Sequence, residues 1–155
     1  MSEVIVKLTG YFEEIIDYYN KEKNVALGIF LCDLDQLKYV NDTYGHKKGD
    51  ELIEAAAKLL KNFFFDNAIV SRVGGDEFAI IIPNTTMYHM EIRCNQLREK
   101  ITHHPVLSND IKLQMSIGMA FSEQSVGKTE SLYIEADKNM YEEKKQGRKL
   151  TALLY

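Results

Sequence analysis

The stretch Ala68–Ile82 reads A-I-V-S-R-V-G-G-D-E-F-A-I-I-I and holds two glycines and two acids between two apolar runs. The runs Ala68–Val73 and Phe78–Ile82 are rich in β-branched residues, which predicts two strands, and Pro83 ends the second one. The four residues between them, Gly74–Glu77, then form the turn of a β-hairpin, whose glycines we expect to supply a positive φ angle. This hairpin decides the fold, because the other elements are arranged around it.

Further strands and helices are predicted on both sides of the hairpin. Ala26–Cys32 is a continuous apolar run, as expected of a strand covered on both faces. Leu113–Phe121 alternates apolar residues with small or polar ones, as expected of a half-buried strand. Apolar residues at helical spacing predict a helix after an N-cap at Thr9, one from Glu51 onward, one around Met90–Ile101, and one around Leu132–Met140 that stops at Gly147.

The predicted order is helix, strand, helices, hairpin, helix, strand, helix. Strands and helices that interleave around one β-hairpin are typical of the α+β class, with a ferredoxin-like arrangement. A hairpin paired with the first strand would bring Asp33 and Asp76 close together. The 155 residues show no internal repeat and no linker, so we expect one domain over residues 1–155.

Composition narrows the classes of function. A net charge of −4 argues against a general nucleic-acid binder, although Lys144, Lys145, Arg148 and Lys149 form a local cationic cluster that suits a small anionic ligand. The two cysteines, Cys32 and Cys94, lie in apolar surroundings and are expected to be reduced. No apolar run approaches the length of a membrane span, and the N-terminus does not resemble a signal peptide. We therefore expect a cytoplasmic chain without a membrane segment.

Two acids are candidates for a metal site. Asp33 ends the first predicted strand and Asp76 lies in the hairpin turn. Mg²⁺ prefers oxygen ligands and is often held by one or two carboxylates together with substrate phosphates. The alternative is that both are turn acids, because aspartate is common in turns. The residues alone predict only a possible metal and phosphate site.

Four sequence blocks resemble the GGDEF family of diguanylate cyclases. They occur in the order of the family, and the resemblance as a whole covers about residues 8–149, so a chance match is improbable. The blocks are Asp33–Asp50 (D-L-D-Q-L-K-Y-V-N-D-T-Y-G-H-K-K-G-D), Arg72–Phe78 (R-V-G-G-D-E-F), Ser116–Ala120 (S-I-G-M-A) and Ala136–Arg148 (A-D-K-N-M-Y-E-E-K-K-Q-G-R).

This resemblance implies a ferredoxin-like palm related to nucleotidyl cyclases, with a mostly antiparallel sheet and the hairpin at the active site. It implies an enzyme that condenses two GTP molecules into cyclic di-GMP and pyrophosphate, with one GTP held by each subunit of a transient homodimer. Two Mg²⁺ or Mn²⁺ ions would be held by the carboxylates of Asp33 and Asp76 and by the backbone carbonyl of Leu34. A sensory domain or partner protein is expected outside this sequence.

The resemblance also assigns roles to single residues. Asp76 or Glu77 would activate the 3′-hydroxyl group, and Lys38 would stabilise charge on the triphosphate. The remaining roles are phosphate binding by Lys144, Arg148, Gly74 and Gly75, guanine recognition by Asn41 and Asp50, and shaping of the nucleotide pocket by His46 and Leu37. For several of these residues an ordinary structural role stays open: Lys144 and Arg148 as helix C-terminal cations, Asp50 as a helix N-cap, and His46 as a surface residue.

The sequence departs from the family pattern in three places. Many relatives carry an Arg-x-x-Asp product-inhibition site, and Phe65 and Ala68 occupy its two positions here, so no such allosteric site is expected. The opening block keeps Leu8–Gly10 but has Val6 in place of an aspartate and lacks the Asn-Arg pair that usually follows. Leu37 replaces a phenylalanine.

Two other functions stay open at this point. The chain could bind GTP as a regulatory ligand without turnover, although the metal, base and guanine positions are all filled. It could instead bind cyclic di-GMP as an effector, which the missing Arg-x-x-Asp residues disfavour.

Overall fold

The computed structural model describes the backbone of residues 5–6 and 9–154 and the side chains of residues 11–147. Its centre is a five-stranded sheet in the order β1-β3-β4-β2-β5. All neighbouring strands are antiparallel except β1 and β3, and β1 is a short strand that the sequence did not predict. The strands are β1 (Ile5–Val6), β2 (Leu27–Leu34), β3 (Ile69–Arg72), β4 (Glu77–Pro83) and β5 (Met115–Ser122).

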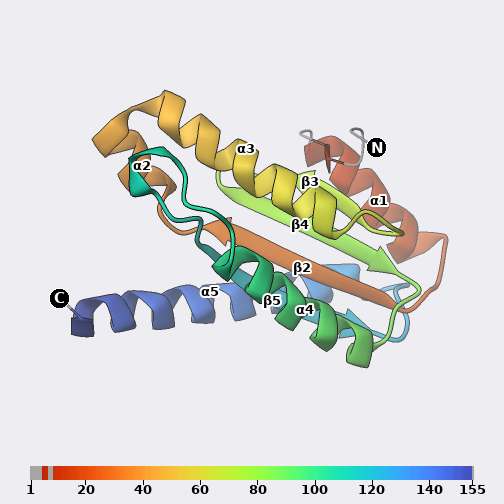
Figure 1. Ribbon diagram of the computed structural model, residues 1–155. Helices are drawn as coiled ribbons and strands as arrows, with labels where there is room; N and C mark the ends of the chain where they lie inside the picture. Colours follow the sequence, from red (N-terminus) through yellow and green to blue (C-terminus); the bar gives the residue numbers. More distant parts are fainter. Residues whose placement is uncertain (1–4, 7–8, 155) are drawn as a thin grey trace.

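Helices cover both faces of the sheet (Figure 1). The helices α3 and α4 pack on one face, and α1 and α5 pack on the other. The short helix α2 lies at the end of the sheet where β2 finishes. The α+β, ferredoxin-like prediction is therefore confirmed. The helices are α1 (Thr9–Lys21), α2 (Leu37–Tyr44), α3 (His46–Phe63), α4 (Met87–Thr102) and α5 (Thr129–Leu154). In the described ranges, none of these helices is long and apolar enough to span a bilayer.

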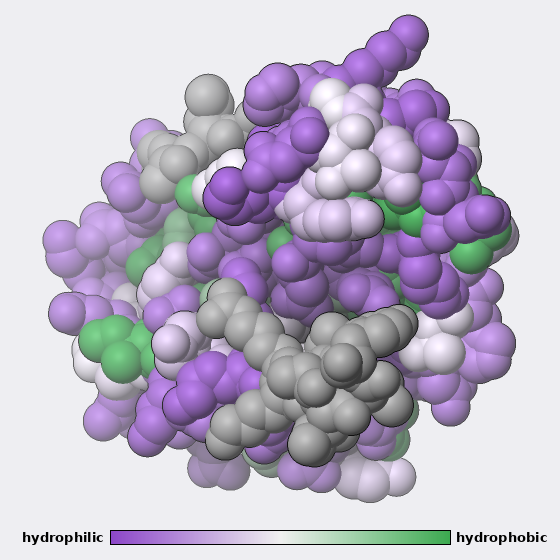
Figure 2. Space-filling model, turned by 90° about the vertical axis from the view of Figure 1, so that its left-hand side faces the viewer, coloured by the Kyte–Doolittle hydropathy of each residue, from purple (hydrophilic) through white to green (hydrophobic). Residues whose placement is uncertain are grey.

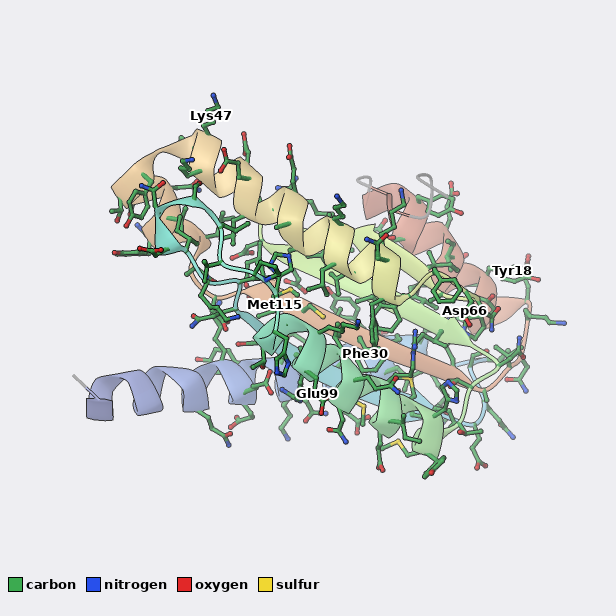
Figure 3. All side chains as sticks on the ribbon, in the orientation of Figure 1. Tyr18, Phe30, Lys47, Asp66, Glu99 and Met115 are labelled. Atoms are coloured by element: carbon green, nitrogen blue, oxygen red, sulfur yellow. The ribbon has the colours of Figure 1, made fainter. Side chains whose placement is uncertain are left out.

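The central strand β2 is buried along its whole length, as its continuous apolar run predicted. Because successive side chains of a strand point to opposite faces, Phe30 and Cys32 join the core under α3 and α4, whereas Ile29 and Leu31 join the core under α1 and α5. Figure 3 labels Phe30 and Met115, which both belong to the first of these cores. A charged residue that follows in this strand, such as Asp33, is therefore carried into covered surroundings.

The prediction that β5 is half-buried was wrong, because α5 covers its small residues. Ser116 and Ala120 are only 2% and 3% exposed. Gly118 lies directly under the backbone of α5: a Cβ atom at this position would come within 2.1 Å of the Ala136 carbonyl oxygen and 2.2 Å of the Met140 nitrogen. The small residues that looked like an outward face in the sequence instead allow the helix to approach the strand closely.

Two predicted helix boundaries were also wrong. Helix α3 begins at His46 rather than Glu51, and its N-cap residue is Gly45, whose φ is 91°. The first turn of this helix is mostly exposed, so it carries no apolar periodicity from which its start could be read. Helix α5 continues through Gly147 to Leu154, and Gly147 does not adopt a left-handed φ. Glycine weakens a helix by about 1 kcal/mol relative to alanine but does not end it.

The two glycines Gly118 and Gly147 should respond oppositely to replacement by alanine. Gly118→Ala should lower the free energy of unfolding by about 1–3 kcal/mol, because the new methyl group must push α5 off the sheet. Gly147→Ala should raise it by up to about 1 kcal/mol, because the position is helical with nothing within 4 Å of the new Cβ atom. Urea denaturation of both variants measures the difference, and equal effects would contradict the close packing of α5.

Candidate active site

The end of β2 meets the hairpin between β3 and β4. Asp33 pairs with Glu77 in the antiparallel register of β2 and β4, and the Leu34 N–H donates a hydrogen bond of 2.8 Å to the Asp76 carbonyl oxygen. The carboxylate of Asp76 lies near enough to Asp33 to raise its pKa. The proximity that the hairpin predicted for these two acids is therefore observed.

The turn of the hairpin is held by the side chain of Arg72. Its guanidinium group donates to the carbonyl oxygens of Gly74 and Gly75, at 3.2 and 2.8 Å. Neither glycine has a left-handed φ, so the expected positive φ angle was wrong: the arginine, and not the backbone conformation of the glycines, stabilises this turn. A Cβ atom on Gly75 would meet nothing within 4 Å. The space above the turn is open to a ligand.

Asp33 is the most unusual charged group of the site. It is only 8% exposed, and its Oδ2 atom lies 3.1 Å from the Lys144 ammonium group. Its Oδ1 atom is buried and has no hydrogen-bond partner among the described residues. Burial raises the pKa of Asp33 from 3.8 to about 6, against the lowering effect of Lys144, and the carboxylate of Asp76 raises it further.

An unpaired buried carboxylate oxygen beside a second carboxylate fits a divalent cation. A buried acceptor without a partner is costly, and a metal ion would satisfy it. Within the ranges that the structure describes, no three His, Cys, Asp or Glu side chains gather as a ligand set. An ion at Asp33 and Asp76 would therefore need backbone carbonyl groups and ligand oxygens to complete its coordination, which is the usual pattern for Mg²⁺ bound with phosphates.

Glu77 faces the helix α5. The Tyr133 hydroxyl group donates to its Oε1 atom at 3.3 Å. Burial raises the pKa of Glu77, and the nearby carboxylates of Asp137 and Asp33 raise it further, whereas the Tyr133 hydroxyl group lowers it. The sequence analysis missed Tyr133 and Asp137. Their spacing of four residues beside the apolar stripe of α5 was the available signal, because it places both on one side of the helix.

A cleft of about 500 Å³ lies between the end of β2, the hairpin, α2 and α5. Lys38 and Leu37 line this cleft from α2, and Lys144 lines it from α5. The Lys38 side chain is 90% exposed, and its ammonium group pairs with Asp42 at 3.0 Å rather than with a carboxylate of the site. Leu37 packs partly against the core. The complete lining is Leu34, Asp35, Leu37, Lys38, Tyr39, Asp42, Asp76 and Lys144.

The residues assigned to guanine lie on α2, which borders this cleft, and on α3, and neither of them lines the cleft itself. The Asn41 Oδ1 atom is buried and has no partner among the described residues. It approaches the backbone of Gly49 so closely that a Cβ atom there would lie 1.7 Å from it. Asp50 and His46 are exposed on α3. The alternative of Asp50 as an N-cap was wrong, because the helix begins four residues earlier.

The remaining phosphate candidates lie on α5. Lys144 contacts Asp33, as described, and Lys145 pairs with Glu142 at 3.7 Å. The side chain of Arg148 lies outside the described residues. The end of the molecule that carries these helices and the hairpin is covered largely by hydrophilic residues (Figure 2), as suits a site for a polar ligand.

The fold and the site together define a class of protein: palm-like α+β domains in which a β-hairpin sets a carboxylate pair at the end of the central strand. The family model of the diguanylate cyclase GGDEF domain matches residues 7–150 of the chain. The chain belongs to this family.

Known proteins agree with this membership. The chain is 31% identical over 134 residues to diguanylate cyclase A of Treponema denticola, and 31% identical over 131 residues to a diguanylate cyclase of Vibrio cholerae. These matches cover 85% and 83% of the chain but only 36% and 40% of the two relatives. The chain thus spans well under half the length of the curated relatives that it matches.

Solved structures share the fold. The active GGEEF domain of a diguanylate cyclase from Vibrio cholerae superposes with a TM-score of 0.72 at 25% identity, covering 90% of this chain and 85% of that one. The FimX GGDEF domain of Pseudomonas aeruginosa superposes with a TM-score of 0.78 over 89% of this chain and 88% of that one, at 17% identity.

The raised pKa of Asp33 predicts how stability depends on pH. The folded state holds the Asp33 proton more tightly than the unfolded state, so ionised Asp33 destabilises the fold above pH 6, and this cost disappears as the pH falls towards 3.8. In chelator-treated buffer, Asp33→Asn should therefore raise the free energy of unfolding at pH 7.5, by up to about 3 kcal/mol. The gain should vanish near pH 4.

Urea denaturation of wild type and Asp33→Asn between pH 4 and pH 8 measures this effect. Asp66→Asn is the control, because Asp66 is exposed and its replacement should matter little at any pH. A larger gain for Asp33→Asn at pH 4 than at pH 7.5 would contradict the assigned burial effect.

Proposed function

We propose that this chain is a diguanylate cyclase, which condenses two GTP molecules into cyclic di-GMP and releases pyrophosphate. The observation that carries the proposal is the unpaired buried Oδ1 atom of Asp33 beside Asp76 at the family's hairpin. An inert turn acid would not be buried at such cost. The whole domain, residues 1–155, is the proposed functional unit.

Two divalent ions, Mg²⁺ or Mn²⁺, are the proposed cofactors. Asp33 and Asp76 would hold them, together with the backbone carbonyl of Leu34 and phosphate oxygens. When bound, such ions supply charge stabilisation at the attacking and leaving oxygens of a phosphoryl transfer.

The residues of the chain then have distinct tasks. Asp76 or Glu77 accepts the proton of the 3′-hydroxyl group, and burial, which raises the pKa of Glu77, makes its carboxylate a stronger base. Lys144, already 3.1 Å from Asp33, stabilises phosphate charge together with Arg148. Lys38 acts from the opposite side of the cleft. Lys38 can break its exposed ion pair with Asp42 at a small cost in free energy, because such surface ion pairs are weak.

The nucleotide is bound at both its ends. The open turn at Gly74 and Gly75 lets the triphosphate approach the backbone. Asn41 and Asp50 read the guanine, and the unpaired buried Oδ1 atom of Asn41 is an acceptor that a guanine N–H would satisfy. His46 and Leu37 shape the pocket beside them.

The product is a symmetric condensation of two GTP molecules, so a transient homodimer with one GTP in each subunit is proposed. A sensory domain or partner protein outside this sequence would control it. Both cysteines are free and buried, which fits the reducing cytoplasm as its compartment. Since Phe65 and Ala68 occupy the positions of the family's inhibitory pair, cyclic di-GMP should inhibit only by competing with GTP.

The metal assignment predicts that Asp76→Asn removes turnover. The amide keeps the shape of the side chain but lacks the charge that holds the ions, so the rate of cyclic di-GMP formation should fall by at least about 1,000-fold with the fold retained. Product is measured by chromatography with Mg²⁺ and GTP, and folding by circular dichroism. Asp66→Asn is the control: Asp66 lies at the far end of the sheet (Figure 3) and should leave the rate unchanged. A rate of cyclic di-GMP formation close to that of the wild type in Asp76→Asn would contradict the metal assignment.

The guanine assignment predicts the choice of base. The Asp50 carboxylate would accept from the N1–H and N2–H₂ groups of guanine but would face a lone pair at N1 of adenine, a mismatch that costs on the order of 1–3 kcal/mol per group. From equal GTP and ATP, cyclic di-GMP should be the main product. Asp50→Ser should lower GTP use and weaken the preference. A mixed or adenine dinucleotide as the main product of the unmodified chain would refute the assignment, even with an intact metal site.

A further inference from the structure

Glu77 has an unusual set of neighbours. Its backbone pairs with Asp33, and the carboxylates of Asp137, Asp33 and Asp76 all act on it. Three negative groups therefore repel the Glu77 carboxylate. The Tyr133 hydroxyl group donates a hydrogen bond of 3.3 Å to this carboxylate and is the donor that the structure shows there. A carboxylate surrounded by other acids would turn away from them unless something holds it, so this donor from α5 holds the direction of the Glu77 side chain.

Tyr133 is itself held by the N-terminal helix. Its ring is half-buried in the core beneath α1 and α5, and its centroid lies 6.0 Å from that of Phe12 at an angle of 59°. Phe12 comes from α1 and is only 5% exposed. A tilted contact of this kind fixes the direction of a ring beyond what burial alone does. Burial, and next the carboxylate of Glu77, raise the pKa of Tyr133 to about 12, so its hydroxyl group keeps its proton and remains a donor.

From these contacts we infer that Tyr133 is a positioning residue for Glu77, and that Phe12 transmits the position of α1 to the active site through it. The inference rests on the proposed cyclase function for its catalytic consequence. A movement of α1 relative to α5 changes the place of Phe12, then the direction of the Tyr133 ring, and finally the support of the Glu77 carboxylate. The helix α1 thereby regulates turnover without touching GTP.

The first test removes only the hydroxyl group. Tyr133→Phe keeps the ring and its contact with Phe12 but leaves Glu77 without its donor. The kcat for cyclic di-GMP formation should fall about tenfold, with the KM for GTP unchanged within about twofold, because the lost interaction acts on the reacting group and not on binding. Tyr88→Phe is the matched control: Tyr88 is 74% exposed on α4 and its hydroxyl group serves nothing in the site. An unchanged kcat, or a raised KM alone, would overturn the inference.

The second test addresses the link to α1. Phe12→Leu should lower kcat to a similar extent although Phe12 does not belong to the site. The double variant of Phe12→Leu and Tyr133→Phe should be no slower than the slower single variant, because both act through one contact. Tyr11→Phe, at the exposed neighbouring position on α1, is the control and should have no effect. Multiplying effects in the double variant would show that Phe12 does not act through Tyr133.

The third readout does not depend on turnover and so separates this inference from the proposed function. The backbone amide resonance of Glu77 in ¹H–¹⁵N spectra of the full chain should shift in Tyr133→Phe and also in Phe12→Leu, but not in Tyr11→Phe. Wild-type protein that makes no cyclic di-GMP would refute the cyclase proposal while these shifts still support the link. A Glu77 resonance that does not move in Phe12→Leu would refute the link whatever the activity.

Discussion

The burial of Asp33 beneath α5 is the constraint on which the site depends. The strand β2 is apolar and covered on both faces, so its last acid enters surroundings where a charge is costly. The ammonium group of Lys144 offsets part of this cost by pairing with the Oδ2 atom of Asp33. It reaches Asp33 because α5 lies close to the sheet. That closeness depends in turn on Gly118, where any side chain would collide with the helix backbone. A glycine two residues along β5 from the partner of Asp33 therefore helps to set the distance between the cation and the carboxylate.

The charges of the site are compatible with the proposed binding of a triphosphate by an acidic chain. Asp33, Asp76, Glu77 and Asp137 lie near one end of the sheet, and among the described residues Lys144 contacts one of them, Asp33. Such a surplus of negative charge repels a phosphate but attracts a divalent cation. The proposed nucleotide would then need the cation in order to bind, so the net charge of −4 does not exclude the proposed GTP site.

The sequence predicted the elements whose apolar residues face a core and failed where a segment extends past it. The strand β2 and the helix α4 were predicted from their apolar residues, which the sheet and its partner helices cover. The start of α3 and the end of α5 lie beyond the sheet, where apolar periodicity has no reason to exist. The turn at Gly74 was misjudged because Arg72, a side chain outside the turn, stabilises it. The contact of Asp33 with Lys144 depends on the tertiary fold and was not predicted, because the family resemblance assigned Asp33 to a metal ion and Lys144 to a phosphate.

The helix α5 makes the two key contacts of the site at once. Tyr133 and Lys144 lie eleven residues apart on this helix, about 16 Å along its axis. Their polar ends nevertheless contact Glu77 and Asp33, which pair directly across β2 and β4. The helix thus contacts both carboxylates, and a displacement of the helix against the sheet changes both contacts together. Since α1 packs on the same face through Phe12, the inferred link from α1 to Glu77 runs through α5.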